Sequence, residues 1–191
     1  ADARAMSYGV MHALVDASCV LAVERTGASS AVQALTVFWV IFGYDVLAFA
    51  AQAPLGALAD RFRLSKAAVY AGLILTAGAL LFTRHSSLAT MVAAGAGNAL
   101  FHLGAGASVL RSSDGRATPA GLFVAPGALG LGLGIWMGRT GVGPSWPFIA
   151  LLVLALPLVD RLHSPEDGIG GSAVRGPAAG ALELALPLLL L

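Results

Sequence analysis

Charged residues are scarce in this chain. Asp, Glu, Lys and Arg together make up 11% of the 191 residues, hydrophobic residues make up 58%, and the mean hydropathy is +0.83. The few charges fall between long uncharged runs and not along one face of amphipathic segments. A water-soluble all-α protein is therefore a poor explanation, and lipid is the expected solvent.

Cysteine is almost absent, and basic runs are missing. Cys19 is the one cysteine, which excludes an intrachain disulfide and a cysteine-rich metal site. The net charge is only +1, and no basic run with interleaved aromatic residues occurs. Nucleic acid is therefore not expected as a partner.

Signatures of catalysis are also missing. The sequence contains no His-Glu-x-x-His zinc motif, no Gly-x-Ser-x-Gly nucleophile elbow and no phosphate-binding loop. Two histidines and two aspartates lie in apolar segments, but their spacing matches no known catalytic metal set. Neither a cofactor nor a bound metal is therefore expected, and metal analysis of the purified protein would test the alternative of an intramembrane enzyme.

Six apolar stretches are long enough, or nearly so, to cross about 30 Å of hydrocarbon, which takes roughly 20 residues. They lie near residues 7–24, 32–58, 67–83, 88–110, 119–138 and 146–159. Short polar connectors separate them, and none is large enough to hold a soluble domain. The sequence therefore predicts an all-α membrane protein in which residues 1–159 form a six-helix transmembrane bundle.

The remainder of the chain changes character twice. Residues 160–180 are polar and are predicted to form a linker, and residues 181–191 are predicted to be the start of a seventh transmembrane helix. Eleven residues are too few to cross a bilayer. We expect a chain of this kind to be a fragment of a longer membrane protein.

Basic residues predict the orientation, because Lys and Arg resist translocation. A cytoplasmic N-terminus places eight basic residues inside and three outside. The inner set is Arg4, Arg61, Arg63, Lys66, Arg111, Arg116, Arg161 and Arg175, and the outer set is Arg25, Arg84 and Arg139. The sequence thus predicts a multi-pass protein of the cell (inner) membrane, with its N-terminus and linker in the cytoplasm.

Five polar residues are predicted to lie at a similar depth in the membrane: His12, Asp16, Asp45, Asn98 and His102. An ionisable group there costs about 3 kcal/mol, so it tends to face protein or water and to have a task. His12 and Asp16 are four residues apart, as are Asn98 and His102, so each pair shares one helical face. All five are predicted to line one hydrated pocket. The alternative is that these residues only form hydrogen bonds between helices. For Asn98 this structural role and a functional role are equally expected.

The six stretches also divide into two sets of three, as in an inverted repeat. In this reading the first stretch corresponds to the fourth, and each carries a histidine with a polar partner on one face. The second and fifth stretches each carry a proline beside small residues, Pro54 with Gly56 and Pro126 with Gly127. A bent helix is expected at both places. In the fifth stretch the predicted bend involves Pro126, Gly127 and Gly130.

Glycine recurs at every fourth position of the fifth stretch, at Gly130, Gly134 and Gly138. This spacing lets a neighbouring backbone approach closely, and close packing is its main expected role.

The run Gly56-Ala57-Leu58-Ala59-Asp60-Arg61 resembles the signature of the loop between the second and third helices of the major facilitator superfamily. Arg63 stands where that family usually has another glycine. The resemblance implies that the loop is a latch that stabilises one access state. Gly56, Asp60 and Arg61 are then gate residues and not solute ligands, and an ordinary helix-end charge is the alternative for Asp60.

Further runs are similar, in kind and order, to the fosmidomycin-resistance branch of that superfamily. They are His12-Ala13-Leu14-Val15-Asp16, Tyr44-Asp45 with Gln52, Gly97-Asn98-Ala99-Leu100-Phe101-His102, and Phe123-Val124-Ala125-Pro126-Gly127. Asp45 replaces an uncharged amide, and Leu103 replaces a proline. The resemblance implies twelve helices in two bundles with the solute site between them. This chain would then supply the first bundle and need a missing C-terminal half, or a second copy of itself, as partner.

These observations predict a secondary transporter that works in the lipid bilayer on protons and a small solute. A pair such as His12 and Asp16 can bind and release a proton near physiological pH, which couples a solute to a proton gradient. We expect a proton-coupled antiporter that exports a small solute or drug, with Asp16 and Asp45 as proton carriers and the other three residues shaping the solute site. The export direction is implied by the resemblance alone. An uptake symporter predicts the same residues, and a non-transporting scaffold derived from the same fold is the third alternative.

Overall fold

The computed structural model describes residues 2–28 and 34–163, and within these ranges the chain forms helices and no strands. In chain order the elements are α1 (Asp2–Ala28), α2 (Ala34–Asp45), the π-helical turn η1 (Val46–Ala50), α3 (Gln52–Phe62), α4 (Ser65–Phe82), α5 (Ser87–Arg111), α6 (Ala117–Thr140) and α7 (Trp146–Leu162). The all-α prediction is confirmed for this part of the chain. The predicted start of a seventh transmembrane helix, and the linker from residue 164 on, lie outside the described residues.

Five helical segments are long and apolar enough to cross a membrane. They are Asp2–Thr26, Val37–Phe62, Ser65–Phe82, Ser87–Arg111 and Ala117–Thr140. α7 has 17 residues, at the short end of what a span requires. Large apolar side chains face outward along the bundle, with Val10, Leu129 and Leu154 being 62%, 78% and 67% exposed. Such a surface suits lipid as the solvent, and the described residues are those of a multi-pass membrane bundle.

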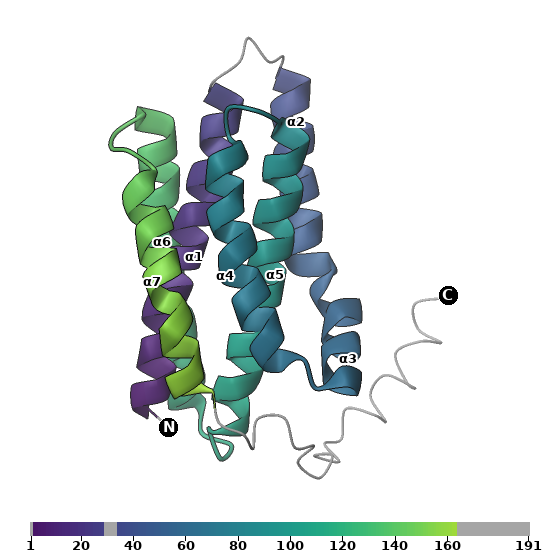
Figure 1. The fold of residues 1–191 in the computed structure, drawn as a ribbon, viewed down its shortest axis with the longest axis vertical. Coiled ribbons are helices and arrows are strands. Elements are labelled where there is room, and N and C mark those ends of the chain that lie inside the picture. The colour runs from purple at the N-terminus through teal and green to yellow at the C-terminus, as the bar shows by residue number, and fades with distance from the viewer. Residues whose placement is uncertain (1, 29–33, 164–191) are drawn as a thin grey trace.

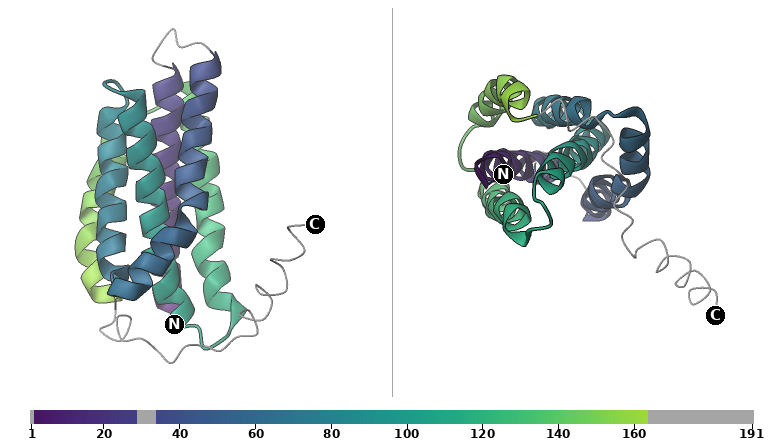
Figure 2. Two further views of the ribbon diagram at one scale, coloured as in Figure 1. Left: turned by 90° about the vertical axis from the view of Figure 1, so that its right-hand side faces the viewer. Right: turned by 90° about the horizontal axis from the view of Figure 1, so that it is seen from below.

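The helices stack in three layers of two, and α1 and α5 form the middle layer (Figures 1 and 2). α4 and α7 cover one side of this layer, and the broken α2–α3 helix and α6 lie on the other side. α1 contacts all of its neighbours α2, α4, α5, α6 and α7. Within the described ranges α2 and α6 do not contact each other. They therefore flank α1 and α5 as two separate ridges.

Glycines set how closely the helices pack. On α6, a Cβ at Gly134 would lie 2.5 Å from the Ala17 carbonyl oxygen of α1, and one at Gly130 would overlap the Ala13 carbonyl. A Cβ at Gly138 would meet the side chain of Glu24 in the same way. The stripe with a period of four is thus the face on which α6 lies against α1, as its spacing predicts. Gly130 belongs to this contact, and not to a break in the helix.

The two proline-containing spans behave differently. Pro54 has no N–H to bond the carbonyl of Ala50, which is the last residue of the π turn η1. In this turn the Ala51 N–H bonds the Val46 oxygen at 3.1 Å. Figure 1 shows the chain changing direction between α2 and α3. α6, in contrast, continues as one helix from Ala117 to Thr140 with Pro126 inside it.

The predicted latch loop is shorter than expected, because Gly56, Asp60 and Arg61 all lie within α3. Only Arg63 and Leu64 separate α3 from α4, and the Leu64 N–H closes the helix end on the Ala59 oxygen at 2.8 Å. Arg63 adopts the left-handed conformation, with φ 56°, that glycine adopts most readily. The helix predicted near residues 32–58 therefore continues to Phe62. Arg63, where the major facilitator signature usually has a glycine, is the residue of this turn whose backbone favours glycine.

Basic residues collect at one end of the bundle, because the helices run up and down in turn (Figure 1). That end holds the start of α1, the α3–α4 turn, the α5–α6 connection and the end of α7. Its seven basic residues are Arg4, Arg61, Arg63, Lys66, Arg111, Arg116 and Arg161, and the other end holds Arg25, Arg84 and Arg139. Two ion pairs join helices at the richer end, Lys66 with Asp160 at 2.6 Å and Arg116 with Asp2 at 3.2 Å.

Candidate functional site

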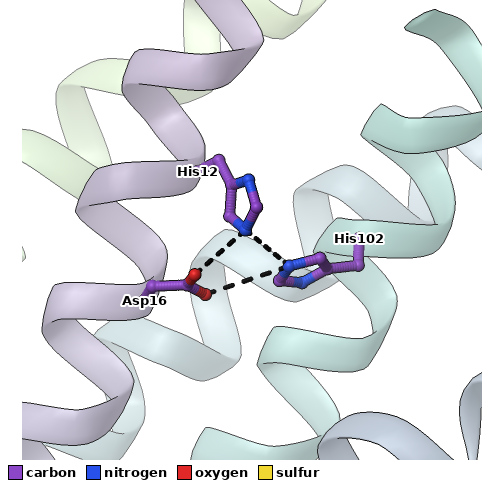
Figure 3. A group of neighbouring side chains, drawn as sticks. All are labelled: His12, Asp16 and His102. Carbon is purple, nitrogen blue, oxygen red and sulfur yellow. Dashed lines mark hydrogen bonds and ion pairs between the residues drawn. The ribbon is translucent and has the colours of Figure 1, made fainter. Parts of the chain in front are cut away.

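Three ionisable side chains from the two central helices meet halfway along the bundle. His12 and Asp16 extend from α1 and His102 from α5, and Figure 3 shows all three pointing toward one another. The Nε2 atoms of the two histidines are 2.6 Å apart. Asp16 lies 3.0 Å from His12 Nε2 through Oδ2, and 3.9 Å from His102 Nε2 through Oδ1. We call these three residues the His–Asp–His cluster.

The cluster is shielded but not sealed. The side chain of His12 is 5% exposed, that of Asp16 13% and that of His102 18%. α1 spans residues 2–28 and α5 spans residues 87–111, so Asp16 and Asn98 stand close to the midpoints of their helices. The sequence prediction that His12, Asp16, Asn98 and His102 share one site agrees with this geometry, because each pair four residues apart lies on the helical face that meets the other helix.

Backbone carbonyls determine which ring nitrogens carry hydrogen. His12 Nδ1 lies 2.9 Å from the Phe123 oxygen, and His102 Nδ1 lies 2.8 Å from the Asn98 oxygen. A carbonyl only accepts, so each Nδ1 donates its N–H. In the neutral rings both Nε2 atoms then present lone pairs to each other. A hydrogen bond between them requires one additional proton, which the Asp16 carboxylate beside them balances in charge. The cluster is therefore arranged to hold a single shared cation.

Asn98 orients the carboxylate. Its Nδ2 donates to Asp16 Oδ1 at 2.8 Å, which links α5 to α1 at the depth of the cluster. Its Oδ1 is buried and has no hydrogen-bond partner among the described residues. An unpaired buried acceptor costs roughly 1–3 kcal/mol.

Aromatic rings and one glycine fix the position of His12. Phe123 of α6 stacks on its imidazole with ring centroids 4.7 Å apart and an interplanar angle of 26°. The ring of His102 meets it edge-on at 4.3 Å and 89°. A Cβ at Gly127 would lie 2.5 Å from both Cε1 and Nε2 of His12, so this glycine provides the space for the ring. Gly127 thus contacts the site directly, in addition to any part in bending α6.

Asp45 does not join the cluster. It is exposed at the end of α2, with no hydrogen bond or ion pair to any described residue, while its neighbour Tyr44 is 5% exposed and faces the bundle interior. Consecutive residues of a helix differ by about 100° in direction, so only one of the two can face inward. The expectation that Asp45 lines the same pocket is not met by this structure. Asp60 and Arg61 are also remote, since they lie exposed at the basic end of the bundle.

Some supporting residues were not predicted. The Phe123 carbonyl bonds His12, and the buried Cys19 follows Asp16 by three residues on α1, with its Sγ 3.5 Å from Thr76 Oγ1 and 3.4 Å from the Ala94 oxygen. Pro126 does not account for the first contact, because a proline leaves the carbonyl four residues before it, here that of Leu122 and not that of Phe123, without a helical donor. No sequence signal indicated either contact.

A second polar cluster closes the basic end. The His163 ring, at the end of α7, lies 3.3 Å from the Tyr8 hydroxyl through Nδ1 and 3.1 Å from Ser65 Oγ through Nε2. All three residues are buried. These contacts tie α1, α4 and α7 together beside the α3–α4 turn, and they are separate from the His–Asp–His cluster.

Comparisons with known proteins give no independent assignment. No protein-family model, curated protein or solved structure matches the chain. The function must therefore be argued from the cluster itself.

Proposed function

We propose that the chain is the first six-helix bundle of a proton-coupled secondary transporter of the major facilitator type, in which the His–Asp–His cluster binds the coupling proton. The observation that carries the proposal is the 2.6 Å approach of two imidazole Nε2 atoms beside Asp16 at mid-height of α1 and α5. Ionisable groups placed so deep in an apolar bundle are costly and mark ion or solute pathways.

Proton binding changes the charge of this site. With one shared proton, an imidazolium beside the Asp16 carboxylate makes the cluster neutral overall, whereas its loss leaves a single negative charge in the middle of the bundle. A transporter needs such a difference, because a loaded site and an empty site must favour different conformations.

The arrangement of the helices supports the same proposal. The two ridges α2 and α6 flank α1 and α5 on one side, and the more exposed members of the cluster are Asp16 and His102. We propose that a second bundle, either a C-terminal half or a second copy, faces this side and completes the solute pathway. The two sets of three helices would then be inverted repeats, with α1 corresponding to α5. In this proposal the basic end of the bundle faces the cytoplasm of an inner-membrane protein.

Proton flux in everted membrane vesicles that contain the chain together with its second bundle tests the function. Respiration acidifies their lumen, a pH-sensitive dye reports the gradient, and fosmidomycin serves as the probe solute. For an exporter we expect fosmidomycin to dissipate the gradient, because each molecule enters the vesicle in exchange for protons. A symporter instead moves fosmidomycin and protons in the same direction.

Two isosteric variants give the test its specificity. Asp16→Asn should abolish the fosmidomycin-dependent proton flux, because the carboxylate that balances the shared proton is lost. Asp45→Asn should retain it, because Asp45 lies outside the cluster. Equal flux in wild type and Asp16→Asn, or no fosmidomycin-dependent proton movement in the wild type, contradicts the proposal and favours a non-transporting scaffold.

A further inference from the structure

We propose that the His–Asp–His cluster is also a binding site for one divalent transition-metal ion of the Zn²⁺ class, held between His12 Nε2, His102 Nε2 and the Asp16 carboxylate. The sequence spacing predicts no metal site, because His12 and Asp16 are four residues apart on α1 while His102 is 86 positions beyond Asp16. The packing of α1 on α5 brings three ligand atoms within 4.8 Å of one another. Two imidazoles and a carboxylate are a donor set that suits Zn²⁺ and its neighbours in the first transition series.

The donor atoms point toward one another. Both Nδ1 atoms are engaged by backbone carbonyls, so the lone pairs on the Nε2 atoms are the ones directed at the centre of the cluster. Metal-bound histidines show this same arrangement, in which the second ring nitrogen donates to a carbonyl or carboxylate and fixes the ring. Asn98 does the equivalent for the third ligand through its bond to Asp16 Oδ1. The outer contacts that a metal site needs are therefore present.

The distances approach those of a tetrahedral face without matching them. Ligands about 2.0–2.1 Å from a tetrahedral Zn²⁺ lie about 3.3 Å from one another. The two Nε2 atoms are 2.6 Å apart, and each histidine meets a different oxygen of Asp16, His12 at 3.0 Å and His102 at 3.9 Å. With one carboxylate oxygen as the ligand, the three ligand atoms lie within 4.8 Å of one another, so binding a metal ion requires the side chains to shift toward a common centre.

Asp16 and His102 form the more exposed side of the cluster, where a fourth ligand would bind. His12 is enclosed by Phe123 and by the glycine backbone at Gly127, whereas Asp16 and His102 keep 13% and 18% of their side chains exposed. Three protein ligands with a fourth position for water or a solute are typical of reactive and exchangeable zinc sites, while structural sites use four protein ligands. We therefore expect reversible binding.

The metal and the shared proton use the same lone pairs, so they exclude each other. Transport itself rests on the proposed function. In a transporter, a site that binds either a proton or a metal ion, but not both, can exchange one cation for the other across the membrane. Metal binding at equilibrium does not depend on transport. The two proposals can therefore fail separately.

Zn²⁺ titration of the purified protein in detergent, in competition with a chromophoric chelator, tests the site. We expect one Zn²⁺ per wild-type chain, and at least about ten-fold weaker binding by His102→Gln and by Asp16→Asn. His85→Gln is the matched control, because His85 is exposed in the α4–α5 connection and outside the cluster. It should bind Zn²⁺ as the wild type does.

X-ray absorption of the zinc-loaded wild type provides a measurement that does not depend on variants. Two imidazole ligands at about 2.0–2.1 Å are expected. Wild-type binding no tighter than that of His102→Gln, equal loss in His85→Gln, or a spectrum without two imidazoles overturns the inference whatever the flux result. Tight binding without fosmidomycin-dependent proton flux leaves the metal site standing and removes the transport proposal.

Discussion

The position of a single imidazole ring decides whether the cluster exists. His12 is fixed by a hydrogen bond to the Phe123 carbonyl, by stacking on the Phe123 ring and by the absence of a side chain at Gly127. Each constraint comes from α6, although the two residues that complete the cluster with His12 belong to α1 and α5. The chemistry of the site thus depends on a helix that supplies no ionisable group to it.

Adding one methyl group to α6 at Gly127 should test whether this helix confines the His12 ring. In Gly127→Ala the new Cβ would lie 2.5 Å from His12 Cε1 and Nε2, so the ring must move away from Asp16 and His102. We expect a loss of about 1–3 kcal/mol in the free energy of unfolding, as is usual when a packed site is overfilled. Zn²⁺ binding should weaken as well. Unfolding in mixed micelles with increasing sodium dodecyl sulfate, together with the zinc titration, measures both.

Gly132→Ala on the same helix is the control, since a Cβ there meets nothing within 4 Å. It should leave Zn²⁺ binding unchanged and keep the stability constant or raise it by up to about 1 kcal/mol, because Ala favours the helix over Gly. If Gly127→Ala behaved in the same way, the ring of His12 would not be confined as the structure shows.

The sequence predicted the site correctly where two polar residues are spaced four apart on one helix. The four-residue separations of His12 from Asp16 and of Asn98 from His102 place each pair on one face, and those faces meet. Asp45 has no such partner on its own helix, so nothing in the sequence indicated which way it points. The structure shows Tyr44 inward and Asp45 outward. Direction around a helix follows from packing against neighbours, which a single span does not reveal.

At the scale of elements, apolar length predicted the five long apolar helices and the shorter α7, but it did not predict where helices end or bend. The second span is interrupted by a π turn before Pro54, and the helix then continues through Gly56, Asp60 and Arg61 to Phe62. A polar run after an apolar one reads as a loop, yet Asp and Arg are compatible with a helix end that leaves the membrane. The turn itself is carried by one residue in an unusual conformation, Arg63.

That conformation yields a stability prediction. Arg63→Gly should raise the free energy of unfolding by about 1 kcal/mol, because glycine has no Cβ penalty at φ 56°. Arg61→Gly removes the same charged side chain two residues earlier, inside α3, and should lower stability by about 1 kcal/mol. Unfolding of both variants in the micelle assay shows whether the free energy of unfolding rises for Arg63→Gly and falls for Arg61→Gly. Stabilisation by both changes would show that loss of positive charge, and not backbone geometry, is responsible.

For the whole molecule, the order of layers explains what the sequence could not supply. Hydropathy predicts six spans but not their neighbours, and the resemblance to a transporter family implies a partner bundle without showing which face it covers. The structure places α1 and α5 in the middle, with their cluster flanked by the ridges of α2 and α6. The side between these ridges is where a second bundle would complete a solute pathway. The inverted repeat and the partner remain predictions.

The distribution of basic residues between the two ends of the bundle predicts its orientation in the membrane. Seven basic residues at one end against three at the other predict that the end with Arg63 faces the cytoplasm and the end with Arg84 faces outward. Both residues are exposed at opposite ends of α4, and Cys19 is fully buried, so a new cysteine would be the one accessible thiol among the described residues. In spheroplasts, a membrane-impermeant maleimide should label Arg84→Cys and spare Arg63→Cys.

Permeabilised cells should label both variants, and the wild type with Cys19 alone should stay unlabelled in either preparation. The reverse pattern would invert the orientation and place the α3–α4 turn outside, where it could not act as a cytoplasmic latch. Equal labelling of the two variants in sealed spheroplasts would mean that α4 does not cross the bilayer. Because α4 packs directly on α5, that outcome would also remove His102 from membrane depth and with it the physical basis of the proton and metal site.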